Sequence, residues 1–316
     1  MNVVDAHVHF WDPGRFRYPW LDGTDAPAAL PAQLATPPGR RLVFVQADCL
    51  PEEGAAEAAW VAGLATQDRR IAAIVAFAPL EHGARVAGEL DALTTIAAVR
   101  GIRRLLQGEP DALFDDQALH AGLRELTARG LAFDACVTHD QLPALLRLRR
   151  AVPEPYLVLD HLGKPPVAAG LDSPAGRAWA AAIAELAREP HSYVKLSGLA
   201  PEADPRRPLG PQALPFLAAA LDAFGPARSM AGSDWPVSTG TPGGDAAWFA
   251  LLESGLGLGP AERDQVLRTT AADFYRLDGD ESGDSPDDGL DDGLDDGLDD
   301  EDPMDDPTDD DPRGAR

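Results

Sequence analysis

Eight short runs of β-branched and apolar residues recur along about the first 275 residues, and helical stretches separate most of them. The runs span residues 3–9, 42–47, 71–77, 99–106, 131–137, 156–161, 192–197 and 229–234. Between them lie segments with helical spacing, such as GAAEAAWVAGLATQ and AGRAWAAAIAELARE. Eight strands that alternate with helices predict a (β/α)8 barrel of the TIM type. An open doubly wound sheet is the runner-up, but such sheets normally have fewer strands, and no glycine-rich phosphate loop follows the first run.

The C-terminal segment has a different composition from the rest of the chain. Residues 278–316 contain 19 acidic residues against two arginines, no aromatic residue, and three tandem copies of DDGL. Mutual repulsion and the lack of apolar side chains predict a disordered acidic tail. We therefore expect two parts, a barrel over residues 1–277 and a tail over residues 278–316. The tail either acts as a solubilising brush or serves as an interaction or weak cation-binding segment.

The remaining composition narrows the class of protein. The whole chain carries a net charge of −25, of which −17 belongs to the tail, so the barrel is mildly acidic. This charge predicts no nucleic-acid partner and no binding to an anionic membrane. No apolar run reaches the length of a membrane span, and we expect no secretory signal, because no basic segment followed by an apolar one stands before the first strand. Cys49 and Cys136 lie in apolar runs and are expected to be buried, reduced thiols, which favours a cytoplasmic location.

The first run, VVDAHVHFW, contains two histidines in an apolar setting. On a strand, Asp5, His7 and His9 share one face, and the intervening apolar residues share the other. These two histidines could pack in the core, bind a metal or act as catalysts. A barrel predicts chemistry at the C-terminal ends of its strands. The candidates at those ends are His7, His9, Arg103, Arg104, Gln107, His161, Lys164, Lys195, Ser197 and Asp234.

The positions of the remaining histidines give less support for a functional role. His82, His120 and His191 are expected to be structural or exposed, because none stands directly after a predicted strand and His191 precedes one. His139 follows the fifth strand within a loop-like segment, so its position is compatible with either a functional or a structural role. Arg103 and Arg104 alternate across a strand, so only one of them can point into the barrel mouth.

An ordered series of motifs resembles the amidohydrolase-related family. The motifs are DAHVHFWDP, YPWLDG, GIRRLLQGEPD, FDACV, LDHLGKP, VKLSGL, AGSDWPV and FYRL. Specifically, they are similar to the sugar-lactonase branch, which includes L-fuconolactonase and L-rhamnonolactonase. The resemblance covers about residues 3–277. It implies a barrel that adds water to a lactone carbonyl, with His7, His9, His161 and Asp234 as the catalytic set. The same branch includes hydrolases of dicarboxylated pyrones.

The sequence departs from the metal-dependent relatives. They carry a histidine after strand five and a bridging lysine or glutamate on strand four, whereas this chain has Cys136 and two arginines at those places. A binuclear centre is therefore not expected. A single zinc could bind His7, His9 and Asp234, with His161 as a further ligand, although the branch does not strictly require a metal.

The residues suggest a mechanism for opening a lactone. Asp234 is expected to be the general base, with its pKa raised toward the working pH by partial burial. The three histidines polarise the carbonyl. We expect Arg103 or Arg104, Gln107, Lys164 and Lys195 to bind the substrate. Trp11, Trp20 and Trp235 are candidates for an apolar wall against a sugar ring. One inward arginine favours a neutral sugar lactone over a dicarboxylate.

Two rival functions remain. One is a metal-dependent decarboxylase with the same barrel, and the other is a non-catalytic binding protein that acts through its acidic tail. The expected partner is a small lactone, and the protein is expected to be a monomer or a small homo-oligomer. The sequence does not specify which lactone is used.

Overall fold

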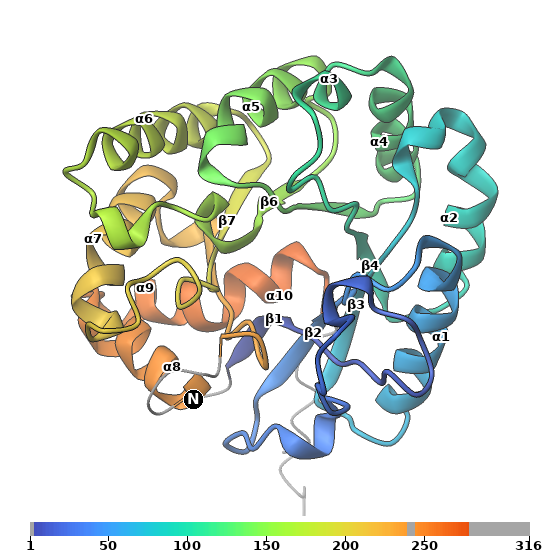
Figure 1. Cartoon of the computed structure of the whole chain (residues 1–316), viewed down its shortest axis with the longest axis horizontal. Helices are drawn as coiled ribbons and strands as arrows, with labels where there is room; N and C mark the ends of the chain where they lie inside the picture. The colour runs from blue at the N-terminus through green and yellow to red at the C-terminus, as the bar shows by residue number, and fades with distance from the viewer. Residues whose placement is uncertain (1–2, 239–243, 278–316) are drawn as a thin grey trace, which may run out of the picture. The chain divides into compact units, whose positions relative to one another are not determined.

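Eight parallel strands lie at the centre of the protein and pair in chain order, from β1 next to β2 through to β7 next to β8 (Figure 1). The computed structural model describes residues 3–238 and 244–277. The strands are β1 Val4–Val8, β2 Arg41–Val45, β3 Ile71–Ala76, β4 Val99–Ile102, β5 Ala132–Ala135, β6 Leu157–Leu159, β7 Ser192–Leu196 and β8 Ser229–Ala231. The predicted (β/α)8 barrel is therefore confirmed, and each strand falls within or one residue outside its predicted run.

Helices surround the strands on the outside. They are α1 Gly54–Ala65, α2 Ala87–Thr94, α3 Asp111–Phe114, α4 Gln117–Ala128, α5 Leu142–Ala151, α6 Pro174–Arg188, α7 Leu209–Phe224, α8 Gly244–Gly255, α9 Pro260–Asp264 and α10 Thr270–Phe274. A π-helical turn, Gln265–Thr269, joins α9 to α10. Short 3-10 turns are η1 Pro19–Leu21, η2 Pro31–Gln33, η3 Pro51–Glu53, η4 Leu80–Val86, η5 His139–Gln141, η6 Asp160–Gly163, η7 Val167–Ala169 and η8 Pro226–Arg228.

Local sequence explains where several helices begin and end. The Asp116 side chain accepts a hydrogen bond from the backbone N–H of Ala118 at the start of α4. Gly130, with a φ of 64°, follows the last residues of the same helix. At α6, the Ser173 side chain caps the first turn and Pro174 occupies its first position. These residues supply partners for free N–H groups and a left-handed exit, so they define the helix ends.

The barrel closes between its first and last strands. The backbone N–H of Asp234 donates to the carbonyl of His7 over 2.9 Å, and that of His9 donates to the carbonyl of Trp235 over 2.8 Å. A parallel bridge between Val8 and Trp235 accompanies these bonds. The closure brings residues from both ends of the barrel sequence to one place at the C-terminal ends of the strands.

The alternation of β1 differs from the expected pattern. Val4 and Ala6 pack with interior residues such as Val43 and Val75, whereas Val8 packs outside the barrel. The register of β1 on β2 shifts between Asp5 and Val8, as at a β-bulge. The strand pattern predicted that Asp5 shares a face with His7 and His9. The structure does not place it there. Its carboxylate instead accepts a hydrogen bond from the backbone N–H of Ser233 over 2.7 Å.

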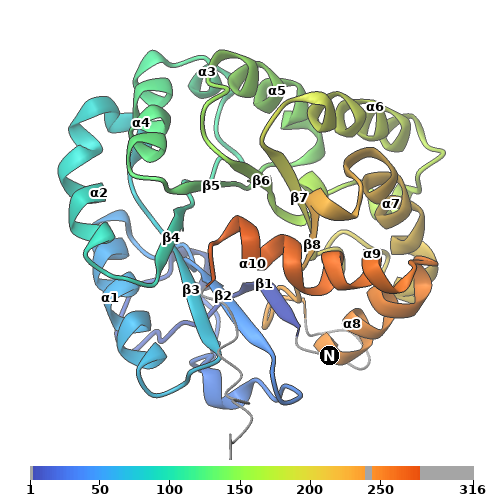
Figure 2. The same ribbon diagram turned by 180° about the vertical axis from the view of Figure 1, so that it is seen from behind.

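The C-terminal residues of the described chain cover the other end of the barrel. Phe274, Tyr275 and Leu277 pack with the interior residues of β1, β2 and β3. Figure 2 shows α10 crossing in front of β1 and β2, on the side opposite to that of Figure 1. The described residues all belong to one compact unit. The predicted acidic tail, residues 278–316, lies outside them.

Candidate functional site

His7 and His9 lie side by side at the end of β1. Their Nε2 atoms are 3.1 Å apart. The Nδ1 atom of His9 lies 2.7 Å from the carbonyl oxygen of Val45. A carbonyl oxygen can only accept, so Nδ1 of His9 carries a hydrogen that points to Val45, and Nε2 faces the site. Burial lowers the pKa of His7 well below its ordinary value, and the nearby Lys195 ammonium lowers it further. His7 is therefore neutral at neutral pH.

Asp234 follows β8 and brings a carboxylate to three histidines. Its Oδ1 atom lies 3.5 Å from Nε2 of His9, 3.7 Å from Nε2 of His161 and 3.9 Å from Nε2 of His7. Its Oδ2 atom accepts a hydrogen bond from the Ser238 hydroxyl over 2.7 Å. Burial by itself raises the pKa of Asp234, but interactions with the histidines outweigh it and hold the pKa below its ordinary value. The expectation of a raised pKa for Asp234 is wrong, because three histidine rings surround this carboxylate and stabilise its ionised form.

His161 is held at the edge of the site by an unusual backbone. It begins a run of left-handed residues within η6, with a φ of 53°. Its Nδ1 atom lies 2.9 Å from the hydroxyl of Ser197. The ring packs on Gly198, where a Cβ atom would meet Nδ1 of His161 at 2.2 Å. Burial lowers the pKa of His161 to about 4, so the ring is neutral at neutral pH.

Four charged side chains from consecutive strands fill the barrel interior beneath the histidines. They are Arg103 after β4, Asp134 in β5, Asp160 after β6 and Lys195 in β7, and all four are buried. The Nζ atom of Lys195 lies 2.5 Å from Oδ2 of Asp134, 3.0 Å from Oδ1 of Asp160 and 3.2 Å from Nδ1 of His7. These charges sum to zero, as buried charges must be paired to be tolerated.

Lys195 lies deeper in the barrel than the other predicted substrate-binding residues. Its side chain is fully buried, and it is not among the residues that line the cavity above the histidines. This position does not support direct contact with substrate, which stays a prediction. Its inward position in β7 is below the barrel mouth, and there it pairs with Asp134 and Asp160 and contacts His7.

Arg103 and Arg104 divide as expected. Arg103 is buried, lies 3.4 Å from Oδ2 of Asp160 and donates to the carbonyl of Gln46. Arg104 points away from the barrel interior and forms ion pairs with Glu81 at 2.9 Å and Glu109 at 2.6 Å. Arg103 is thus the arginine that faces the site.

A cavity of about 280 Å³ opens above these groups at the C-terminal ends of the strands. His9, Arg103, Gln107, His161, Lys164 and Asp234, which we predicted, line it together with Trp20, Asp48, Cys136, Gly198, Glu202 and other residues. Trp20 is the one of the three candidate tryptophans that lines the cavity. Trp235 instead packs near Phe10, with ring centroids 6.0 Å apart, and Trp11 packs edge-on against Trp20.

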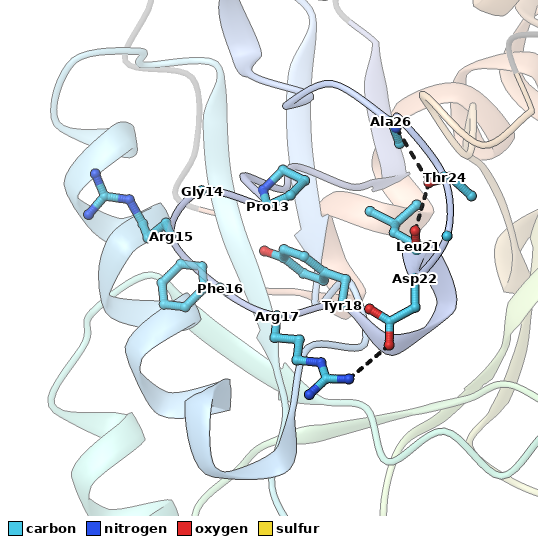
Figure 3. Close-up of a pocket in the computed structure, with 11 residues that line it drawn as sticks. Pro13, Gly14, Arg15, Phe16, Arg17, Tyr18, Leu21, Asp22, Thr24 and Ala26 are labelled. Carbon is cyan, nitrogen blue, oxygen red and sulfur yellow. Dashed lines mark hydrogen bonds and ion pairs between the residues drawn. The ribbon is translucent and has the colours of Figure 1, made fainter.

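A second cavity, of about 340 Å³, is enclosed by the loop that follows β1 (Figure 3). The side chains of Arg17 and Asp22 pair across it at 2.9 Å, and the Thr24 hydroxyl donates to the carbonyl of Leu21. Its lining residues include no histidine and no unpaired carboxylate. The chemistry therefore belongs to the cavity above His9 and Asp234.

The remaining histidines and the cysteines lie outside the catalytic cluster. His120 is buried and contacts the carbonyl of Phe114, whereas His82 lies near Glu89 at the surface. His191 is exposed and packs against Tyr156 before β7, with the two rings tilted at 50°. His139 lies 3.1 Å from the carbonyl of Lys164 and is not among the cavity-lining residues. Both cysteines are free and buried, as expected.

The donor set of the site fits a single divalent metal. His7, His9 and Asp234 each offer one ligand atom, and these atoms lie within 4.8 Å of one another. Two histidine nitrogens bound to one tetrahedral zinc are about 3.3 Å apart, close to the 3.1 Å between the two Nε2 atoms. The carbonyl of Val45 orients His9 through its other nitrogen, as is usual for a ligating histidine.

Sequence reasoning missed five residues that the structure brings to this region. Asp134, Asp160 and Tyr275 belong to the buried polar network, and Asp48 and Glu202 line the cavity. The strand alternation contained a signal for Asp134, because it occupies an inward position between two apolar residues of β5. Asp48 and Glu202 lie in loops, where no periodicity indicates the direction of a side chain.

Comparisons with known proteins place the chain in a family. A protein-family model described as Amidohydrolase matches residues 4–277. The chain belongs to this amidohydrolase family. It is 37% identical over 287 residues to a protein from Burkholderia ambifaria named L-fucono-1,5-lactonase, with 87% of this chain and 96% of that protein covered.

Two further relatives agree with this placement. A crystal structure of an amidohydrolase from Burkholderia multivorans with bound zinc has a TM-score of 0.74 and 35% identity, and the match covers 88% of this chain and all of that one. A protein from Scheffersomyces stipitis named L-rhamnono-gamma-lactonase is 26% identical, with 72% of this chain and 74% of that protein covered. No described helix of this chain combines the length and apolar character that crossing a membrane requires.

Proposed function

We propose that this protein hydrolyses the ring ester of a small sugar lactone. The chain is a lactonase of the amidohydrolase family, as its relatives named L-fucono-1,5-lactonase support. The observation that carries the proposal for the site is the position of Asp234. Its Oδ1 atom lies 3.5 to 3.9 Å from the Nε2 atoms of three histidines at the base of one open cavity.

The proposed substrate is a 1,4- or 1,5-lactone such as L-fuconolactone or L-rhamnonolactone. The names of two relatives support this choice, since one denotes a 1,5-lactone and the other a γ-lactone. The volume of about 280 Å³ lies just below the roughly 300–1,000 Å³ of typical small-molecule pockets and suits a single lactone ring of a six-carbon sugar acid. We place the reaction in carbohydrate metabolism in the cytoplasm, carried out by a monomer or small homo-oligomer.

In the first step, a water molecule attacks the lactone carbonyl carbon and gives up a proton. Asp234 takes this proton at Oδ1, the oxygen that faces the histidines, while Oδ2 stays bonded to Ser238. Because the histidines keep its pKa low, Asp234 is ionised and able to accept at every pH near neutrality. A positioned general base of this kind contributes roughly 10²–10⁴-fold to the rate.

The developing oxyanion requires hydrogen-bond donors. His161 is neutral, and the hydroxyl of Ser197 can donate to its Nδ1 atom, which leaves the hydrogen on Nε2. That Nε2–H faces the position of the reacting carbonyl and donates to the oxyanion. The tetrahedral intermediate then collapses, the ring C–O bond breaks, and the leaving oxygen takes the proton back from Asp234. The products are a hydroxy carboxylate and a proton.

A divalent metal would be held by His7, His9 and Asp234. When bound, it would polarise the carbonyl and lower the pKa of water. The buried ion pairs of Lys195 hold His7 in place in either case. A decarboxylase is not proposed, because the inward residues of β5 and its following loop are Asp134 and Cys136, and His139, the histidine after that strand, does not line the cavity.

The test is hydrolysis of a panel of sugar lactones, followed with a pH indicator before and after exhaustive chelation, with the metal content measured. Asp234→Asn serves as the catalytic control. Activity that survives chelation supports the mechanism that needs only Asp234 and the histidines. Activity that is lost and then restored by zinc assigns His7 and His9 as ligands. A wild-type protein that turns over no lactone in either state contradicts the proposed function.

A further inference from the structure

We infer that Asp48 and Glu202 make the site selective for neutral, polyhydroxylated lactones and reject lactones that carry a carboxylate. This inference rests on the proposed function and extends it to the substrate class. It depends on which charged groups around the cavity already have partners and which do not. Both residues line the cavity, and both are partly exposed.

The cationic side chains of the cavity are already engaged. Arg103 donates to Asp160 and to the carbonyl of Gln46, and the carboxylates of Asp134 and Asp48 lie near enough to stabilise its charge further. Only 4% of its surface is exposed. Lys164 donates from Nζ to Oε1 of Gln107. A substrate carboxylate would therefore meet Arg103, which is already paired with a carboxylate, and Lys164, which is bound to a neutral amide. Three carboxylates, those of Asp48, Glu202 and Asp234, line the same cavity.

The carboxylates of Asp48 and Glu202 are not tied up in this way, and Asp48 has only the longer-range attraction of Arg103. Within residues 3–238 and 244–277, neither side chain makes a hydrogen bond or ion pair, although the backbone around each is fixed. The N–H of Asp48 donates to Oε1 of Gln46 over 2.5 Å, and Asp48 has a left-handed φ of 60°. The carbonyl of Glu202 accepts from the N–H of Ala168 over 2.9 Å. The carboxylate oxygens of Asp48 and Glu202 are thus free to accept hydrogen bonds from a ligand.

Acceptors on opposite loops suit a ring that carries hydroxyl groups. Each sugar hydroxyl can donate to a carboxylate, and hydrogen bonds to charged acceptors are stronger than neutral ones. Trp20 lines the same cavity, and its Nε1–H donates to the carbonyl of Ala47 over 2.7 Å, next to Asp48. This bond fixes the indole beside the carboxylate, so that a ring can pack on it while its hydroxyls face Asp48.

The same charges affect the product. The substrate lactone is neutral, whereas hydrolysis creates a carboxylate in a cavity that already holds Asp48, Glu202 and Asp234. Like charges in a partly desolvated space repel, so the product anion binds more weakly than the lactone. The two unpartnered carboxylates therefore select the substrate and promote release of the product.

The experiment compares a neutral lactone with a lactone of an aldaric acid, which keeps one free carboxylate. kcat/KM for both is measured in wild type, in Asp48→Asn, in Glu202→Gln and in the double variant. These substitutions keep shape and remove charge. We expect each to raise KM for the neutral lactone about tenfold with little change in kcat. We also expect the preference for the neutral over the anionic lactone to fall at least about tenfold in the double variant.

Inhibition by the hydroxy-acid product gives a second readout, and it should become stronger in the same variants. Glu52→Gln is the matched control, because Glu52 is exposed and does not line the cavity. An unchanged preference together with unchanged product inhibition in the folded double variant would overturn the inference. If the wild type hydrolyses neither lactone, the proposed function has failed and this inference falls with it, so the two failures are distinguishable.

Discussion

The hydroxyl of Tyr275 donates a hydrogen bond to Oδ2 of Asp134 over 2.8 Å, although 141 residues separate them. The same carboxylate oxygen lies 2.5 Å from Nζ of Lys195. The end of the described chain therefore closes the lower end of the barrel with apolar side chains and also reaches the buried charges. Through Lys195, this contact is connected to His7 at the base of the candidate site.

Tyr275→Phe tests this connection. The ring remains packed in the barrel, but one buried donor to a carboxylate is lost, so we expect the free energy of unfolding to fall by about 1.5–3 kcal/mol. kcat should not change, because Lys195 still holds His7. Denaturant unfolding and lactone turnover measure the two effects. Tyr193→Phe is the control, since the described residues offer no hydrogen bond to its hydroxyl; an equal loss in both variants would contradict the role given to the Tyr275 hydroxyl.

Lys195→Met should be far more damaging. It leaves Asp134 and Asp160 buried without their shared cation, and breaking a buried pair in this way costs about 3–5 kcal/mol. The second substitution Asp134→Asn removes one of the stranded charges and should recover part of that loss. Unfolding of the single and double variants measures the coupling. Strictly additive losses would show that the two side chains do not act as a pair.

Gly198→Ala is expected to disable His161. A Cβ atom at this position would meet Nδ1 of His161 at 2.2 Å, so the ring must move away from Asp234. We expect kcat to fall at least about 10²-fold, as for loss of a transition-state donor. Gly257→Ala is the matched control, because Gly257 has a similar φ of 66° and nothing within 4 Å of the added carbon. Both variants should lose about 1–2 kcal/mol from the left-handed backbone, but only the first should lose activity.

Asp234→Asn removes the proposed base and keeps its shape. The backbone bond from its N–H to His7 is unaffected, so the barrel should still close. We expect kcat to fall by about 10²–10⁴-fold with little change in KM. Steady-state kinetics on the preferred lactone measure this. A variant with nearly wild-type kcat would exclude Asp234 as the proton acceptor.

Glu57→Gln should change how stability depends on pH. Burial raises the pKa of Glu57 from its ordinary value of 4.5 to about 7, although the backbone N–H of Ala47 opposes the shift. Between these pH values the folded state keeps a proton that the unfolded state releases, so stability falls as pH rises from 4.5 to 7. The difference corresponds to about 3 kcal/mol at pH 8.

The Glu57→Gln variant avoids that cost. It should be more stable than wild type at about pH 8 and similar to it at about pH 4, because the amide side chain is neutral at both. Thermal unfolding at the two pH values measures the difference. Equal stabilisation at both pH values would show that the gain comes from packing and that the carboxylate is not the cause.

Much of the architecture follows from the sequence. The eight runs determine the number and order of the strands, because strand and helix periodicities are local properties. The barrel then explains why His7, His161 and Asp234, which are far apart in sequence, meet at one end. The three residues stand directly at or after the ends of their strands, and the barrel gathers those ends. The family resemblance added the reaction expected of these residues, which is the hydrolysis of a lactone.

Only the tertiary structure decided the pKa values and the ion pairs of the charged groups in the site. The sequence predicted a raised pKa for Asp234, but three histidines from β1 and η6 surround the carboxylate and lower its pKa. It also predicted that Lys195 binds substrate, whereas Asp134 and Asp160 hold this side chain beneath the cavity. A pKa and a buried ion pair depend on distances between distant segments, which no local pattern contains. Local periodicity was therefore enough to predict the barrel, whereas the charge of each group was decided by its three-dimensional neighbours.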